Sequence, residues 1–414
     1  MKIKNKDPRI ANLIELETER QKTSLEMIPS ENHCSSAVRE ALGSLLTDKY
    51  AEGYPGKRYY SGLKYYDILE DLCRERAKKL FKVEHANVQP YSGSPANAAV
   101  YMATCEPGDT IMGMALPMGG HLTHGWKVNF SAKFFKSVQY GVDKKTHLIN
   151  YNEVEKLAKE NRPKLIWVGA TAYPRIFDWK RLGEIADSFG AYLAADIAHI
   201  AGLVAGGAHP SPVPYVHIVS TTTHKTLRGP RGGIIMVTKK GLEKDTDLAK
   251  KIDKAVFPGL QGGPHENAIA AIAVCLKEAS TVAFKKYAHQ IVKNAKMLAE
   301  QLKKHEFNLI SGGTDNHLLL IDLRNKNITG TAAADLLEEV GITINKNSIP
   351  YDPAGPFNPS GIRMGTPAIT TRGMKEKEMK QIAGWISEVI SNPKSTKKVR
   401  EEIKKLCKKF PLPN

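Results

Sequence analysis

Cysteine is scarce in this sequence, and its placement argues against two kinds of protein. The 414 residues include five cysteines, which are widely separated and form no CxxC pair: Cys34, Cys73, Cys105, Cys275 and Cys407. An odd number of scattered cysteines argues against a disulfide framework and against a cysteine-based zinc site. We therefore expect reduced thiols.

Long apolar runs are also missing. No stretch approaches the roughly 18 apolar residues that a membrane-spanning helix needs. The first residues, MKIKNKDPRI, contain lysines but are not followed by the apolar segment of a signal peptide. A cytoplasmic protein is therefore the expectation from the sequence.

Acidic residues are fewer than basic ones. The chain has 43 Asp and Glu against 60 Lys and Arg, a formal net charge of +17. Many lysines occur in pairs within amphipathic patterns, such as Lys303-Lys304 and Lys408-Lys409, which is typical of solvated helix faces. No zinc finger, RNP-type sequence or basic stripe with interleaved aromatic residues accompanies the charge. Small anionic ligands explain the charge better than nucleic acid, and RNA binding stays an alternative.

The most informative stretch places a lysine after an apolar, β-branched run. Residues 217–233 read HIVSTTTHKTLRGPRGG, and the run ends just before His224 and Lys225. The pattern predicts a buried strand with Lys225 at its end. Burial and nearby cations lower the pKa of a lysine, and its neutral amine can form a Schiff base with a carbonyl. Pyridoxal phosphate is the natural partner, although most lysines after strands are simply exposed.

A second predicted strand ends in a carboxylate. Residues 191–203 read AYLAADIAHIAGL, with Asp196 at the carboxyl end of the apolar run, where open α/β sheets bind ligands. Pyridoxal phosphate needs a protonated pyridine nitrogen, which a buried carboxylate maintains. Asp196 is the candidate partner of that nitrogen, and His199 can reach the ring's phenolic oxygen. Alternatively, Asp196 could cap a helix and His199 could be a core histidine, or both could be metal ligands. Neither alternative accounts for Lys225.

Two loops carry further candidates. Ser92-Gly93-Ser94, followed by Pro95, predicts a helix that opens at Pro95 with free amides and hydroxyls, suited to a phosphate or simply a capped helix. His121 and His124 are three residues apart in a glycine-rich loop, as metal ligands can be, but no third ligand at suitable spacing is evident.

Strand and helix patterns alternate over residues 86–237, which predicts a doubly wound, mostly parallel sheet. A helix is expected over residues 8–26, and an ordered loop over residues 49–61, which are rich in Gly, Pro and Tyr. After Pro264 a helical pattern with short breaks runs to residue 304. The expected C-terminal α+β domain contains HLLLIDL, AAADLLEEVG and GITINKN, with closing helices over 373–391 and 395–409.

Many motifs, in order along the chain, resemble those of serine hydroxymethyltransferases, which are fold-type I pyridoxal-phosphate enzymes. They are SENHCSSAVREALGSLLTDKYAEGYPGKRYYSG, VQPYSGSPAN, GGHLTHG, DIAHIAGL, TTTHKTLRGPRGG, FPGLQGGP, SGGTDNHLLLIDL and SGIRMGTPA. The resemblance implies an α/β fold of the aspartate aminotransferase-like type. A large domain (86–280) then holds a mostly parallel seven-stranded sheet, a smaller α+β domain follows (281–414), and an N-terminal helical arm with an active-site loop precedes (1–85).

The resemblance also implies an activity. The serine hydroxymethyl group is transferred reversibly to tetrahydrofolate, the co-substrate, giving glycine and 5,10-methylenetetrahydrofolate, with pyridoxal phosphate held covalently by Lys225. The implied assembly is a homodimer with shared active sites. An aldolase of the same cofactor class, acting on threonine-like substrates or α-methylserine, is the alternative.

Roles for single residues are implied by the same resemblance, with no metal ligand among them. Glu52 handles the substrate hydroxyl, and the other catalytic candidates are Lys225, His121, Asp196, Tyr60 and Arg231. The implied cofactor contacts are Ser92, Gly93, Ser94, His121, Thr171, Asp196, His199, His224, Lys225, Tyr50, Gly262 and Gly263. The implied serine and folate contacts are Ser30, Glu52, Tyr60, Arg363, Leu116, Gly120, Leu122, Asn347 and Phe357.

Some of these residues act across the dimer interface in the family, namely Tyr50, Glu52, Tyr60, Gly262 and Gly263. The sequence also departs from the usual family pattern near the site. Pro29 replaces an alanine and Thr171 a serine, and Ser61, Leu63 and Lys64 replace Gly, Cys and Glu. We expect these changes to tune activity without abolishing it.

Overall fold

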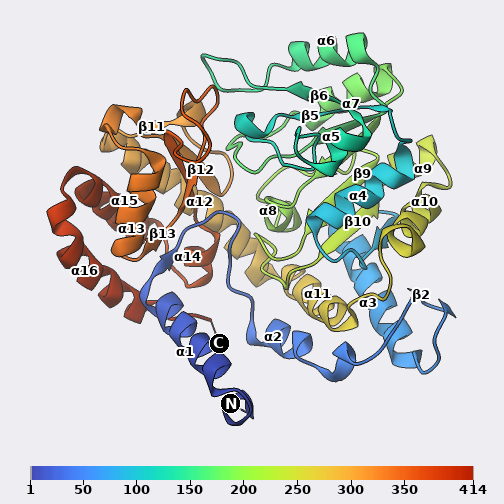
Figure 1. Cartoon of the computed structure of the whole chain (residues 1–414), viewed down its shortest axis with the longest axis horizontal. Helices are drawn as coiled ribbons and strands as arrows, with labels where there is room; N and C mark the ends of the chain where they lie inside the picture. Colours follow the sequence, from blue (N-terminus) through green and yellow to red (C-terminus); the bar gives the residue numbers. More distant parts are fainter. Residues whose placement is uncertain (1, 414) are drawn as a thin grey trace.

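The computed structural model describes residues 2–413 and contains a seven-stranded sheet, which occupies the upper right of Figure 1. The strand order is β4-β10-β9-β8-β7-β5-β6. Neighbours from β9 to β6 pair in parallel, whereas β10 is antiparallel to both β9 and β4. The mostly parallel sheet expected from the sequence is confirmed. Its strands are β4 (His85–Asn87), β5 (Thr110–Met114), β6 (Lys136–Tyr140), β7 (Leu165–Val168), β8 (Tyr192–Asp196), β9 (Ile218–Thr222) and β10 (Gly233–Val237).

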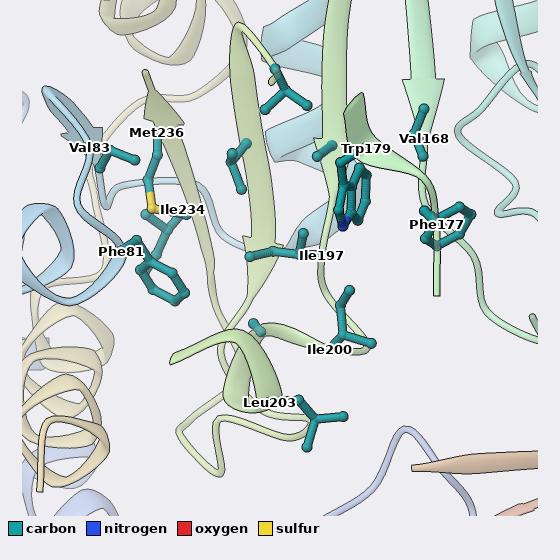
Figure 2. Packing of buried hydrophobic residues seen from close by; sticks show 14 of the residues in the cluster. Phe81, Val83, Val168, Phe177, Trp179, Ile197, Ile200, Leu203, Ile234 and Met236 are labelled. Atoms are coloured by element: carbon teal, nitrogen blue, oxygen red, sulfur yellow. The ribbon is translucent and has the colours of Figure 1, made fainter. Parts of the chain in front are cut away.

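Apolar residues cover both faces of this sheet, because alternate residues of a strand point to opposite sides. In β10, Ile234 and Met236 belong to one apolar cluster, and Ile235 and Val237 to another. Figure 2 shows Ile234 and Met236 beside Phe81 and Val83. On the first face lie α3 (Lys64–Phe81), α6 (Tyr151–Asn161), α7 (Trp179–Ser188), α8 (Ala201–Ala205) and α11 (Glu266–Ala279), and on the other α4 (Gly93–Thr104) and α10 (Leu248–Lys254).

A second apolar core lies under a four-stranded antiparallel sheet, ordered β11-β12-β15-β14. The helix α12 (Val282–Lys304) joins the two cores, since Phe284 and Ile291 pack in the first and Leu298 and Leu302 in the second. The remaining elements are β11 (Asn308–Leu309), β12 (Leu318–Asp322), β14 (Asn345–Asn347), β15 (Gly361–Gly365), α13 (Gly330–Glu339), α14 (Pro367–Thr371), α15 (Glu376–Ser391) and α16 (Thr396–Lys409). The domain boundaries 1–85, 86–280 and 281–414 stay a prediction.

The N-terminal segment joins the C-terminal core. The helix α1 (Pro8–Thr23) lies beside α16 (Figure 1) and ends three residues earlier than the 8–26 expected, because Ser24 is extended and β1 (Leu25–Glu26) pairs in parallel with β13 (Ile342–Thr343). The helix α2 (Ser36–Leu42) then leads to a hairpin of β2 (Gly53–Tyr54) and β3 (Lys57–Arg58).

Among residues 2–413, no single helix is both long enough and apolar enough to cross a membrane. Only α11 and α12 taken together meet the length and composition, and they bend by 82° where they join.

Candidate active site

Two adjacent strands bring Asp196 and Lys225 to one pocket. Asp196 is the last residue of β8 and pairs with Ser220 of β9, the strand after which Lys225 follows. Because β8 and β9 are parallel, their carboxyl ends meet at one edge of the sheet. The residues that line the pocket are Gly93, His121, His124, Ala170, Thr171, Asp196, Ala198, His199, Thr222 and Lys225.

The Asp196 carboxylate is held by three donors. Its Oδ2 lies 3.1 Å from His124 Nε2 and accepts from Asn97 Nδ2 at 2.9 Å, and its Oδ1 accepts from the Ala198 N–H at 3.0 Å. Burial alone would raise the pKa of Asp196, but the interactions with His124 and Asn97 outweigh it and leave the pKa below its usual range. The indole of Trp167 stacks on His124 at 5.2 Å and fixes its ring. Asp196 is therefore a fixed anion.

The amine of Lys225 is poised to lose its proton. Burial lowers the pKa of Lys225 to about 8, and the Arg363 and Arg231 charges act in the same direction while Asp196 opposes them. A lysine with such a pKa has a substantial neutral fraction near pH 7, which is the form that attacks carbonyl carbon.

The amino end of α4 borders the same pocket. The helix begins at Gly93, two residues before the predicted start, so Pro95 is its third residue. Ser92 is the N-cap residue, but its side chain accepts no hydrogen bond from the helix, which leaves the first amides of a 12-residue helix free to bind an anion. A Cβ on Gly93 would lie 2.8 Å from Thr222 Cγ2, so glycine allows this close approach.

Three histidines surround Lys225 in neutral form. Burial lowers the pKa of His121 to about 4 and that of His224 to about 3. His121 Nδ1 lies 2.7 Å from Thr123 Oγ1, and the buried His199 has its Nδ1 3.2 Å from His317 Nε2. Burial also lowers the pKa of His199 well below its usual value. The pocket thus offers flat, uncharged rings beside a buried carboxylate.

Arg363 reaches the pocket from the second sheet. Its Nε donates to Asn345 Oδ1 at 3.0 Å and its Nη1 to the Thr171 carbonyl. Burial lowers the pKa of Arg363 to about 10, so it stays cationic at neutral pH. Pro29 packs on the same strand, because a Cβ on Gly365 would lie 2.8 Å from Pro29 Cβ. This contact places Ser30, the next residue, beside the strand of Arg363.

A second group of predicted residues forms away from this pocket. The rings of Tyr50 and Tyr60 stack at 5.3 Å. A Cβ on Gly262 would lie 3.2 Å from Glu52 Oε1, and one on Gly263 would lie 3.2 Å from the Tyr50 ring. None of these residues lines the pocket of Lys225. The described chain therefore carries two separate groups of predicted site residues.

The predicted folate contacts lie in two stretches of the chain, 116–122 and 347–357, and differ in exposure. Leu122 is 42% exposed and Phe357 89% exposed, and the catalytic candidate Arg231 is exposed as well. Leu116 and Asn347 are half-buried, whereas the buried Gly120 accepts a hydrogen bond from Thr171 Oγ1 at 2.8 Å. Apart from Thr171, none of these lines the pocket of Lys225.

The sequence model of the serine hydroxymethyltransferase family matches residues 3–386. The chain belongs to the serine hydroxymethyltransferase family. It is therefore a fold-type I, pyridoxal-phosphate-dependent transferase that uses tetrahydrofolate in serine, glycine and one-carbon metabolism. Nothing in the match favours the aldolase alternative.

Pyridoxal phosphate, the family's cofactor, fits the polar groups of the pocket. Among the described residues, Thr222 Oγ1 and His124 Nδ1 of the pocket lining, and Nδ1 of His224 next to Lys225, are buried without a hydrogen-bond partner. Such groups are normally paired, so they suit a polar ligand. The α4 amino end suits a phosphate, the Lys225 amine an aldehyde, and the Asp196 carboxylate a protonated ring nitrogen.

The alternative interpretation, a metal site, needs a third ligand, and the structure places one near His121 and His124. Ligand atoms of His121, His124 and Asp196 lie within 4.8 Å of one another, a proximity that sequence spacing did not reveal. However, the Asn97 amide donates to Asp196 Oδ2, and an N–H group directed at this oxygen competes with a cation. The donor set therefore suits a pyridinium better than a metal ion.

Sequence reasoning did not assign several residues that hold the site. Asn97 lies in the quoted SGSPAN motif, one helical turn from the Ser92-Gly93-Ser94 segment, but its contact with Asp196 joins residues 99 positions apart. His317, the residue before β12, contacts His199, which lies 118 positions earlier in the chain. Tyr91 stacks on His265 at 4.2 Å and donates to the Gly263 carbonyl at 2.7 Å. Only the helical spacing of Asn97 offered a local signal.

Proposed function

We propose that the protein is a glycine hydroxymethyltransferase that holds pyridoxal phosphate covalently on Lys225. The observation that carries the proposal is the pairing, in one pocket, of a lysine with a lowered pKa and a carboxylate held in place by hydrogen bonds. That pair matches the two ends of the cofactor ring system, an aldehyde and a basic nitrogen.

The cofactor, when bound, takes up the electrons released as the Cα–Cβ bond of serine breaks. Asp196 holds a proton on the ring nitrogen, and His124 and Asn97 keep the carboxylate oriented. His121 would contact the cofactor ring, and Thr171 and His199 would contact its phenolic oxygen. Ser92, Gly93 and Ser94 would bind the phosphate at the amino end of α4, beside His224.

The substrates bind through residues on both sheets. Arg363 and Ser30 bind the carboxylate of the amino acid, and Arg231 supports the ring on the substrate side. Glu52 takes and returns the proton of the serine hydroxyl, as a general acid–base, with Tyr60 beside it. The folate contacts are Leu116, Gly120, Leu122, Asn347 and Phe357.

A homodimer with shared active sites is part of the proposal. The separation of Tyr50, Glu52, Tyr60, Gly262 and Gly263 from the Lys225 pocket supports it, because these residues then complete the pocket of the partner subunit. The free cysteines suit a reducing compartment, which supports a cytoplasmic location.

Two measurements test the activity and the covalent link. Purified protein with pyridoxal phosphate is expected to convert ¹³C-labelled serine to glycine only when tetrahydrofolate is present, as followed by NMR. Folate-independent cleavage of threonine, with no folate response on serine, would favour the aldolase. Borohydride reduction is expected to fix the cofactor to the Lys225 peptide, as read by mass spectrometry, and Lys225→Gln is the control.

A further inference from the structure

A buried ion cluster lies beneath the hairpin that follows Glu52. At its centre is Arg58 of β3, whose side chain is 4% exposed. Its Nε donates to Asp67 Oδ1 at 2.9 Å and its Nη2 to Glu70 Oε2 at 2.8 Å, and both carboxylates belong to α3. Glu266 Oε1, at the start of α11, lies 3.5 Å from the same Nη2. The guanidinium is thus hydrogen-bonded to α3 and lies close to the start of α11.

The remaining Arg58 donor reaches the backbone on both sides of Glu52. Nη1 donates to the Ala51 carbonyl at 2.6 Å and to the Gly53 carbonyl at 3.0 Å. The Glu52 carbonyl accepts from the Tyr59 N–H at 3.0 Å. Three consecutive carbonyls are therefore bound by Arg58 or the residue after it, which leaves the peptide groups around Glu52 little freedom to rotate.

Gln89 reinforces the same arrangement. Its Nε2 donates to the Gly53 carbonyl at 2.9 Å and to Glu70 Oε1 at 2.9 Å, and the residue is buried. The cluster also reaches the Gly262-Gly263 segment, because Glu266 follows Gly263 by three residues and Gly262 approaches Glu52. One guanidinium thus connects the two segments of the second group of predicted site residues.

The charges of the cluster explain why it can remain buried. Burial and the neighbouring Glu70 raise the pKa of Glu266, so this carboxyl is neutral at pH 7. Burial raises the pKa of Glu70 as well, and Arg58 opposes that shift, while its hydrogen bond helps to lower the pKa of the partly exposed Asp67. Lysine cannot replace arginine here, because an ammonium has three donors on one atom and lacks the planar fork that serves four acceptors.

We propose that Arg58 is a positioning residue that fixes the place of the Glu52 carboxylate in the reaction. The proposal rests on the role proposed above for Glu52. Arg58 touches neither substrate nor cofactor and acts only through the backbone that carries Glu52. A displaced general acid–base slows proton transfer more than it weakens binding of the amino acid, which Arg363 and Ser30 hold from other segments.

The test is a double-mutant cycle with Arg58→Lys and Glu52→Gln in the holoenzyme. Arg58→Lys is expected to lower kcat about 10- to 100-fold while the serine KM changes less than about threefold and the bound pyridoxal phosphate is unchanged. In the Glu52→Gln background, Arg58→Lys is expected to cost less than about twofold, because the carboxylate that it positions is gone. Single-turnover measurements at high enzyme concentration resolve the low rates.

The matched control is Arg74→Lys, on the same helix α3. Arg74 pairs with Asp71 at 3.1 Å and donates to the Ala86 carbonyl at 3.3 Å, and within residues 2–413 it makes no hydrogen bond to the hairpin, so kcat should stay at the wild-type value. Equal losses from Arg58→Lys in both backgrounds, or a wild-type kcat for Arg58→Lys, would overturn the proposal. A wild-type kcat for Glu52→Gln would instead overturn the role of Glu52 itself. If Arg58→Lys does not fold, Gln89→Met replaces it, and a wild-type kcat for that variant would overturn the proposal.

Discussion

The lowered pKa of Lys225 makes a quantitative prediction for the cofactor-free protein. A pKa of about 8 leaves about 9% of the amine neutral at pH 7, whereas the ordinary value of 10.5 leaves about 0.03%. The neutral fraction is therefore about 300-fold larger, and it rises with pH until it levels off above pH 8. Lys225 should react with an amine reagent at pH 7 far faster than its limited exposure alone would suggest.

Charge removal should move this pKa in opposite directions. Asp196 raises the pKa of Lys225, so Asp196→Asn should lower it and speed the reaction at pH 7. Arg363 lowers the pKa of Lys225, so Arg363→Met should raise it and slow the reaction. The two signs follow from Coulomb interaction with an ammonium and do not depend on its exact strength.

Competitive labelling with acetic anhydride measures both effects. The extent of acetylation of the Lys225 peptide is followed by mass spectrometry from pH 6 to pH 11. The peptide of Lys239, whose side chain is 82% exposed, serves as the internal reference for reagent decay. A midpoint near 10.5 for Lys225, or shifts of the same sign in the two variants, would refute the electrostatic reasoning.

Two further substitutions test the frame of the site. Gly93→Ala should weaken pyridoxal-phosphate binding about tenfold or more by equilibrium dialysis, because its Cβ would lie 2.8 Å from Thr222 Cγ2. The control is Gly43→Ala, whose Cβ would have no contact closer than 3.6 Å. Equal affinities of the two variants for pyridoxal phosphate would contradict the steric argument. Arg372→Met should lower the free energy of unfolding by about 2–4 kcal/mol in urea, because Arg372 donates to the Ser24, Cys407 and Phe410 carbonyls. A urea midpoint equal to that of the wild type would contradict this prediction. The stability of Arg372→Lys should lie between those of the wild type and Arg372→Met.

Local patterns in the sequence were enough to predict the mostly parallel sheet. Apolar, β-branched runs ending at Asp196 and shortly before Lys225 predicted β8 and β9. Such a prediction is possible because a buried strand consists of apolar residues that are consecutive in the sequence. The errors of the prediction lay at the ends of helices. The first helix stops at Thr23 because Leu25 pairs with Ile342, and that partner lies more than 300 positions away. The same reasoning placed the start of α4 two residues late.

The sequence also determined the family and the list of candidate residues, since these depend on the order of motifs along the chain. Only the tertiary structure decided which of those residues meet. It joined Asp196 to Asn97 and His124, and it separated Glu52 from Lys225. It also revealed Arg58 as the anchor of the Glu52 segment. Hydrogen bonds and charge interactions act over a few ångströms in space, and the residues that form them are set by how strands and helices pack.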